Sequence, residues 1–389
     1  MVIYQFLIAV RSQNGAGGQA VQLTNADGET TSHVQGLFNR TIRFLTEGIR
    51  PVYVFDGKPP NLKSSELGKR REKREKAEAA LKVANEEGNI EEQDRQNKRL
   101  VRAGQKENED CKKLLELMGI PVIRAPCEAE AQAAALAKRG LVYATATEDM
   151  DALTFQTPVL LRKMTFANAS KAMIQTMNYQ KALEGLELDH DQFVDLCILM
   201  GCDYCDSIRG VGPKTALKMI REHKNMESLL KNLDRKKYTV PDSWEPNKKK
   251  QKTDEDYDTD EEKEKEKTEN DVDEEEEETT EEEPVYVQAR RLFNNHEVLE
   301  SPEIKFKACQ AEELTKFLVD EMGFNPERVK ANIEKLQKAF KATSKPQARM
   351  DSFFKAVPNP NAKAIAEKKK ATAKENKKKG GGFFGKRKR

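Results

Sequence analysis

The sequence predicts an α/β protein with a mainly parallel central sheet flanked by helices. Short runs rich in β-branched residues alternate with helical stretches through the first half of the chain, an order typical of parallel sheets. Acidic residues follow several of these runs. A long, highly charged stretch with few large apolar residues separates the first two expected strands, which indicates helices that project from the core.

The expected strands are short and lie in the first half of the chain, at 52–55, 121–123, 142–147 and 159–161. Between the first two, the stretch from Glu66 to Asp110 contains strong helix formers and a glycine at position 88. We therefore expect two helices joined by a turn. The pattern alone leaves open whether this pair is a solvated hairpin or a functional projection.

The second half of the chain is expected to be helical. Residues 191–233 form consecutive short helices, and helical periodicity resumes at 285–293, 311–322 and 326–340. The almost purely charged segment 246–283 cannot bury enough apolar surface to order, so we expect disorder there. The chain thus divides into a core over 1–245, an acidic insert over 246–283, a C-terminal helical part of the core over 284–341 and a basic tail over 342–389.

The formal net charge of +2 conceals opposed regions. Residues 254–283 contain 20 acidic and 3 basic side chains, whereas residues 361–389 contain 12 basic and 2 acidic side chains. The rest of the chain therefore carries about +9, a bias that favours a polyanionic partner such as nucleic acid. The sequence contains no apolar run of about 18 residues and no signal peptide, so we expect no membrane partner.

Acidic residues recur where strands end or helices begin. They are Asp56, Glu128, Glu130, Asp149, Asp151 and Asp203. Because the carboxyl ends of parallel strands converge at one edge of a sheet, we expect these side chains to share a crevice. Carboxylates are the preferred ligands of hard cations such as magnesium, and two such ions can hydrolyse a phosphodiester. Each acidic pair alone is more often a polar turn, but their combination favours a two-metal site.

A glycine-rich turn spans residues 208–214, with Gly210 and Gly212 before Pro213 and Lys214. The glycines permit close backbone approach, and the helix that begins at the proline offers free N–H groups. An ordinary helix–helix turn is the alternative. The pattern favours contact with a nucleic-acid backbone without recognition of its sequence.

The six cysteines show no even spacing, which favours a reducing intracellular compartment. Cys202 and Cys205 have the C-x-x-C spacing of a zinc or redox site. A second such pair is missing at a suitable distance, and the four histidines have no ligand spacing. Free, partly buried thiols are therefore expected rather than zinc.

Beyond these patterns, the chain resembles the eukaryotic flap endonucleases, a family of structure-specific 5′ nucleases with a PIN-like fold. The resemblance runs from Ile3 to about Phe354, interrupted by the acidic insert. It rests on long and uncommon motifs, namely IYQFLIAVR, GETTSH, PVYVFDGKPP, LMGIP, EAEAQ, ATEDMDALTF and FVDLCILMGCDYCDSIRGVGPK. The family trims 5′ flaps during Okazaki fragment maturation and long-patch base excision repair, and it also acts as a 5′–3′ exonuclease.

The resemblance assigns roles to individual residues. The six carboxylates named above correspond to ligands of two magnesium ions, and Lys63 and Arg70 to cations near the scissile phosphate. Residues 60–110 correspond to a helical arch, and residues 191–233 to a helix-two-turn-helix that also holds a potassium ion. The expected DNA contacts are Tyr4, Arg11, Thr31, Arg70, Glu128, Gly210, Gly212, Lys214 and Phe324.

A Q-x-x-M-x-x-F-F segment lies in the basic tail, formed by Gln347, Met350, Phe353 and Phe354. One helical turn would place its apolar side chains together as a plug for a groove. By the resemblance, it binds the trimeric sliding clamp, proliferating cell nuclear antigen. The terminal KRKR favours nuclear import or further phosphate contact, and the family implies a monomer located in the nucleus, with a possible mitochondrial pool.

The sequence departs from the family at its start, because a strand that ends in a further metal-binding aspartate precedes the equivalent of Ile3 in the family. Without that strand we expect an opened sheet ladder and a weakened metal site. Two explanations are open: an incorrect start or fragment, or a shortened form that binds DNA junctions and the clamp without cutting. The acidic insert either mimics DNA or keeps the chain soluble.

Overall fold

The computed structural model describes residues 2–9, 30–101, 103–164, 174–245 and 283–342. Arg11, nearly all of the acidic insert and the tail segment with Gln347, Met350, Phe353 and Phe354 lie outside the described residues. Within the described part, no helix combines the length and apolar character needed to cross a membrane.

The strands are as short as the sequence predicts, but they form two sheets instead of one. Strand β1 (Tyr53–Phe55) pairs in parallel with β2 (Val122–Arg124). The second sheet has β4 (Val159–Arg162) at its centre, parallel to β3 (Thr145–Ala146) and antiparallel to β5 (Gln175–Asn178). The expectation of a mainly parallel sheet is confirmed for β1 to β4, whereas the antiparallel β5 was not predicted.

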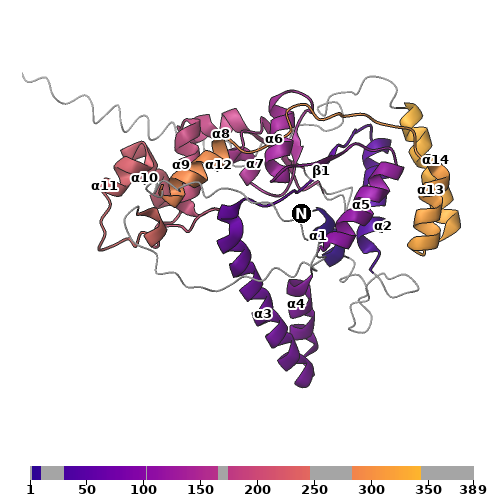
Figure 1. Ribbon diagram of the computed structural model, residues 1–389, viewed down its shortest axis with the longest axis horizontal. Coiled ribbons are helices and arrows are strands. Elements are labelled where there is room, and N and C mark those ends of the chain that lie inside the picture. The colour runs from indigo at the N-terminus through magenta and orange to yellow at the C-terminus, as the bar shows by residue number, and fades with distance from the viewer. Residues whose placement is uncertain (1, 10–29, 102, 165–173, 246–282, 343–389) are drawn as a thin grey trace, which may run out of the picture.

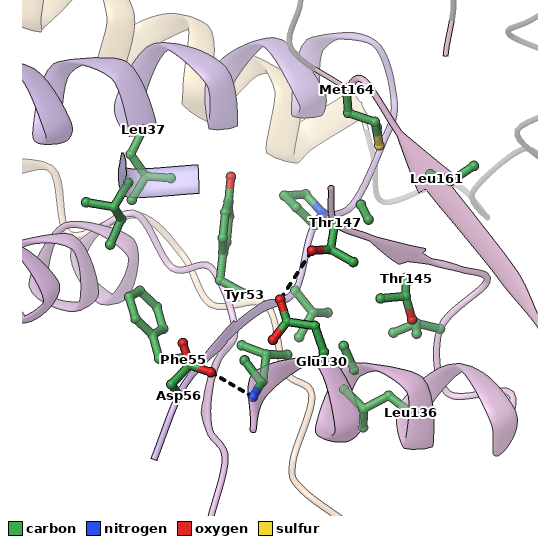
Figure 2. Close-up of a pocket in the computed structure, with 18 of the residues that line it drawn as sticks. Leu37, Tyr53, Phe55, Asp56, Glu130, Leu136, Thr145, Thr147, Leu161 and Met164 are labelled. Atoms are coloured by element: carbon green, nitrogen blue, oxygen red, sulfur yellow. Dashed lines mark hydrogen bonds between the residues drawn. The ribbon is translucent and has the colours of Figure 1, made fainter. Parts of the chain in front are cut away.

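A cavity of about 1540 Å³ separates the two sheets, lined by residues of β1, β3 and β4 (Figure 2). Among the described residues β1 and β3 do not pair, so no ladder connects the two sheets. The expected strand over 142–147 is correspondingly reduced to β3, because only Thr145 and Ala146 have a partner.

One hydrophobic core lies on the side of β1 and β2. Helices α2 and α5 pack there with the C-terminal helices α13 and α14, and α1 packs against α2 (Figure 1). A π-helical turn (Phe317–Glu321) follows α13, so the helix expected over 311–322 is not uniform. The helix bounds are α1 Val2–Ala9, α2 Ser32–Thr46, α5 Gln105–Leu117, α13 Ala311–Lys316 and α14 Pro326–Ala342.

A second core lies beyond β3 to β5 and is built from helices α6 and α9 to α12, with the single tryptophan Trp244 buried in it. These helices are α6 (Ala129–Lys138), α9 (His190–Met200), α10 (Pro213–His223), α11 (Met226–Lys231) and α12 (Val285–Asn294). The short helices α7 (Asp151–Thr154) and α8 (Tyr179–Leu186) contribute to a smaller buried cluster with β4. A 3-10 turn (Asp242–Trp244) precedes the acidic insert.

A buried ion pair connects the segment after the acidic insert to the segment before it. Arg290 of α12 donates to both carboxylate oxygens of Asp195 on α9, at 2.8 and 3.0 Å, and to Glu227 on α11 at 2.8 Å. Asp195 is only 2% exposed. Burial raises the pKa of Asp195, while the guanidinium opposes that shift. The pair therefore holds α12 in place against α9 and α11.

The charged stretch after β1 forms two helices that extend away from both cores, as predicted (Figure 1). Helix α3 (Ser64–Glu86) follows a 3-10 turn (Asn61–Lys63), and α4 (Ile90–Leu100) returns along it. Gly88 makes the turn at φ +66°, and the Asn89 side chain caps α4 by accepting from the Glu92 N–H. The projecting pair ends at Leu100, since the next helix, α5, packs in the first core.

Candidate metal and nucleic-acid site

Three of the predicted carboxylates meet at the edge of β1 and the start of α6. Oxygens of Asp56, Glu128 and Glu130 lie within 4.8 Å of one another. Asp56 directly follows β1 and accepts a hydrogen bond of 2.9 Å from the Ala129 N–H in the first turn of α6 (Figure 2). This bond satisfies a free N–H at the helix start and holds Asp56 toward the other two carboxylates.

A second group of carboxylates consists of Asp149, Asp151 and Asp203. They line a smaller cavity of about 390 Å³. Thr147, just after β3, connects this group to the first: its hydroxyl donates to Glu130 at 3.2 Å and accepts from the Asp149 N–H at 3.1 Å. The Asp151 N–H in turn donates to Asp149 at 3.0 Å.

The electrostatics of the site favour a bound cation. Burial raises the pKa of Glu130, and the nearby Asp56 and Asp149 raise it further. Burial likewise raises the pKa of Asp151 to about 7, with added repulsion from Asp149 and Asp203. Carboxylates held this close repel one another unless protons or cations neutralise them. Their oxygen atoms suit hard divalent cations, so the residues present fit such ions.

Lys63 and Arg70 lie at the base of the projecting helices, and Lys63 connects the two carboxylate groups. The Lys63 ammonium contacts both oxygens of Glu128 at 2.8 and 2.9 Å and Asp203 at 3.3 Å. Arg70 donates to both oxygens of Asp203 at 3.1 and 2.9 Å. Burial alone would lower the pKa of Lys63, but its contacts with Glu128 and Asp203 raise it above the ordinary value. Both residues predicted to act near a phosphate are therefore charged and adjacent to the carboxylates.

The glycine turn precedes α10 as expected. Gly210 has φ +89°, and a Cβ there would lie 3.3 Å from the Tyr238 ring, so both backbone conformation and space favour glycine. Gly212 is the N-cap of α10, Pro213 is its first residue, and Lys214 is exposed beside it. The first N–H groups of α10 thus lie next to a surface cation.

The remaining predicted DNA contacts lie in different surroundings. Tyr4 on α1 is 37% exposed and available to a ligand. Thr31, at the N-terminal end of α2, is buried at 3% exposure, and Phe324 packs partly against the first core.

His296 belongs to the site, although the sequence gave no reason to include it. Its Nδ1–H donates to the Leu292 carbonyl at 3.3 Å, which leaves Nε2 to accept from the Glu128 N–H at 3.4 Å. Burial lowers the pKa of His296, which agrees with this neutral form. The contact joins residues 168 positions apart, so no local pattern could have indicated it.

Comparison with known proteins identifies the family. Residues 1–77 match the XPG N-terminal domain and residues 119–203 match the XPG I-region. The chain is 68% identical over 373 residues to flap endonuclease 1 of Phaeodactylum tricornutum, covering 96% of this chain and 88% of that protein. It is 49% identical to flap endonuclease 1 of Phytophthora infestans, with 97% and 90% covered.

A solved structure shows the same fold. Flap endonuclease-1 from Methanococcus jannaschii superposes with a TM-score of 0.59 at 32% identity, covering 88% of this chain and 90% of that one. High identity over nearly the whole length, together with the shared fold and the acidic cluster, places this chain in the flap endonuclease 1 family of structure-specific nucleases.

Proposed function

We propose that this chain hydrolyses branched DNA at the base of a 5′ flap, with two magnesium ions held by Asp56, Glu128, Glu130, Asp149, Asp151 and Asp203. The convergence of these carboxylates from separate segments of the chain carries the proposal. These carboxylates would hold the ions, which when bound would supply an activated water and stabilise the charge on the attacking and leaving oxygens.

The side chains around the carboxylates bind and orient the DNA. Lys63 and Arg70 contact Glu128 and Asp203 directly, so a phosphate bound beside these carboxylates lies within reach of both cations. Positive groups held there stabilise the charge that develops on the phosphate during cleavage. Helices α3 and α4 project away from this point and from both cores (Figure 1), a position suited to the passage of a single-stranded 5′ end.

The rest of the junction is held by surfaces away from the carboxylates. The N–H groups at the start of α10, together with Lys214, suit the phosphates of the duplex, and carbonyls of the Gly210 to Gly212 turn suit a potassium ion. Tyr4 supplies an exposed aromatic face on which a base can stack. With Arg11 and Phe324, it completes the DNA contacts that we propose, whereas Thr31 is buried at the start of α2.

We further propose that the tail segment with Gln347, Met350, Phe353 and Phe354 binds a trimeric sliding clamp. The support is its sequence, which combines an apolar plug with a basic surrounding. We propose that the chain pairs a flap nuclease site with a clamp-binding segment. It would then act as a monomer in the nucleus, in Okazaki fragment maturation and long-patch base excision repair.

Cleavage of a labelled 5′-flap duplex tests the proposal. With magnesium, the chain is expected to release the flap, and a chelator is expected to stop it. Asp149→Ala and Asp151→Ala should each slow cleavage about 10³-fold, which corresponds to about 4 kcal/mol in the activation barrier, because each removes a metal ligand. Binding of the flap substrate, measured by fluorescence anisotropy, should persist in both variants. Binding without any cleavage by the unaltered chain would instead identify a non-catalytic junction protein.

A further inference from the structure

A pair of cysteines flanks one of the metal-binding carboxylates. Cys202 and Cys205 lie on either side of Asp203, in the turn after α9, and an isolated antiparallel bridge joins the two residues. Their Sγ atoms are 3.6 Å apart. Paired residues in such a bridge have Cα atoms about 4.5 to 5.5 Å apart, which is within the range that a disulfide requires.

Both cysteines border the cavity of the second carboxylate group. Cys202 and Cys205 are partly exposed, and both line the cavity of about 390 Å³ that also contains Asp149, Asp151 and Asp203. A small, uncharged oxidant that enters this cavity therefore comes close to both cysteines. By contrast, Cys309 lies in the first core, against helices that do not border this cavity.

We propose that Cys202 and Cys205 form a reversible disulfide when a peroxide enters the cavity. One thiol attacks the peroxide, breaks the O–O bond, and becomes a sulfenic acid as the first water leaves. The second thiol then attacks that sulfur, and the S–S bond forms as the second water leaves. The two sulfurs are oxidised and the peroxide is reduced. A small dithiol reverses the step by exchange and is itself oxidised to a disulfide.

Closing the bond changes the geometry of Asp203. The sulfurs must close from 3.6 Å to about 2.05 Å, and this change of roughly 1.5 Å, shared between the two side chains, ties together the residues on either side of Asp203. A misplacement of about 1 Å in a catalytic site can cost about 10²-fold in rate. We therefore expect the oxidised chain to cleave a flap at least about tenfold more slowly. This part of the inference depends on the proposed function, whereas formation of the bond does not.

Peptide mapping tests bond formation without any need for activity. The chain is treated with hydrogen peroxide in a chelator, alkylated under denaturing conditions and digested with chymotrypsin. Cleavage after Tyr204 places Cys202 and Cys205 on separate peptides, and cleavage after Leu199 or Met200 removes Cys197. The expected product is a linked pair of peptides that dithiothreitol separates, with Cys309 alkylated throughout.

Flap cleavage before and after peroxide tests the consequence, and each variant is compared with its own reduced form. The unaltered chain and the control Cys309→Ser should lose at least about tenfold and recover with dithiothreitol, whereas Cys205→Ser should lose little. Cys202→Ser provides a second variant with the same expectation. Absence of the linked peptides, or a link to Cys197, overturns the proposed bond.

Two further outcomes separate the parts of the inference. Full linkage with unchanged cleavage overturns the effect on Asp203 and leaves the bond established. Absence of cleavage by the reduced chain contradicts the proposed function, while the peptide map still decides whether the bond forms.

Discussion

Burial and the neighbouring Asp149 and Asp203 disfavour the charged form of Asp151. Replacement by asparagine keeps the shape of the side chain and removes its charge. The pKa of Asp151 is raised from 3.8 to about 7, which corresponds to at most about 4 kcal/mol of repulsion and desolvation in the folded state. Asp151→Asn should therefore stabilise the fold when divalent ions are absent, and it should slow cleavage when magnesium is present.

The pH dependence follows from the direction of the shift. Between 3.8 and about 7 the folded chain holds a proton on Asp151 that the unfolded chain releases, so the free energy of unfolding falls as pH rises through this window and levels off above it. Asparagine has no such proton. The gain from Asp151→Asn should therefore be about 3 kcal/mol larger at about pH 8 than at about pH 5.

Urea denaturation of both chains in a chelator, followed by tryptophan fluorescence of the buried Trp244, measures this difference. Asp206→Asn is the matched control: it lines the same cavity but is well exposed and pairs with Lys69, so its effect should stay below about 1 kcal/mol at either pH. Equal effects of Asp151→Asn at both pH values, or a loss of stability at the higher one, would refute the electrostatic reasoning. Added magnesium should stabilise the unaltered chain more than the variant.

Three other predictions address different parts of the molecule. Arg290→Met should lower the free energy of unfolding in urea by about 3 kcal/mol, because it leaves Asp195 buried without its partner; a loss below about 1 kcal/mol would contradict that role. Lys63→Ala should lower kcat on a flap substrate by about 10²-fold with little change in KM, and Lys63→Arg should lose less; a higher KM with unchanged kcat would indicate a role in binding only. His296→Ala should weaken magnesium affinity, measured by calorimetry without DNA, by about tenfold through a misplaced Glu128, and His296→Asn should lose less; equal affinities would exclude this positioning role.

Local patterns were sufficient to predict the elements that carry the site. The runs that became β1, β2 and β4 were recognisable because β-branched residues alternate with helical stretches, and Asp56 and Asp149 could be placed just after strands by position alone. The projecting helices were recognisable because α3 and α4 lack an apolar face; only Ala77, Ala84 and Gln96 are buried along them. These features depend on neighbours a few residues apart.

Tertiary packing decided what those elements bring together. Lys63 reaches Glu128 across 65 positions, Arg70 reaches Asp203 across 133, and His296 reaches Glu128 across 168. The sequence likewise could not show the size of the cavity that β1 and β3 border, or that Cys202 and Cys205 line the same cavity as Asp203. Such contacts depend on how the two cores pack against each other, and the periodicity of a single segment carries no information about that packing.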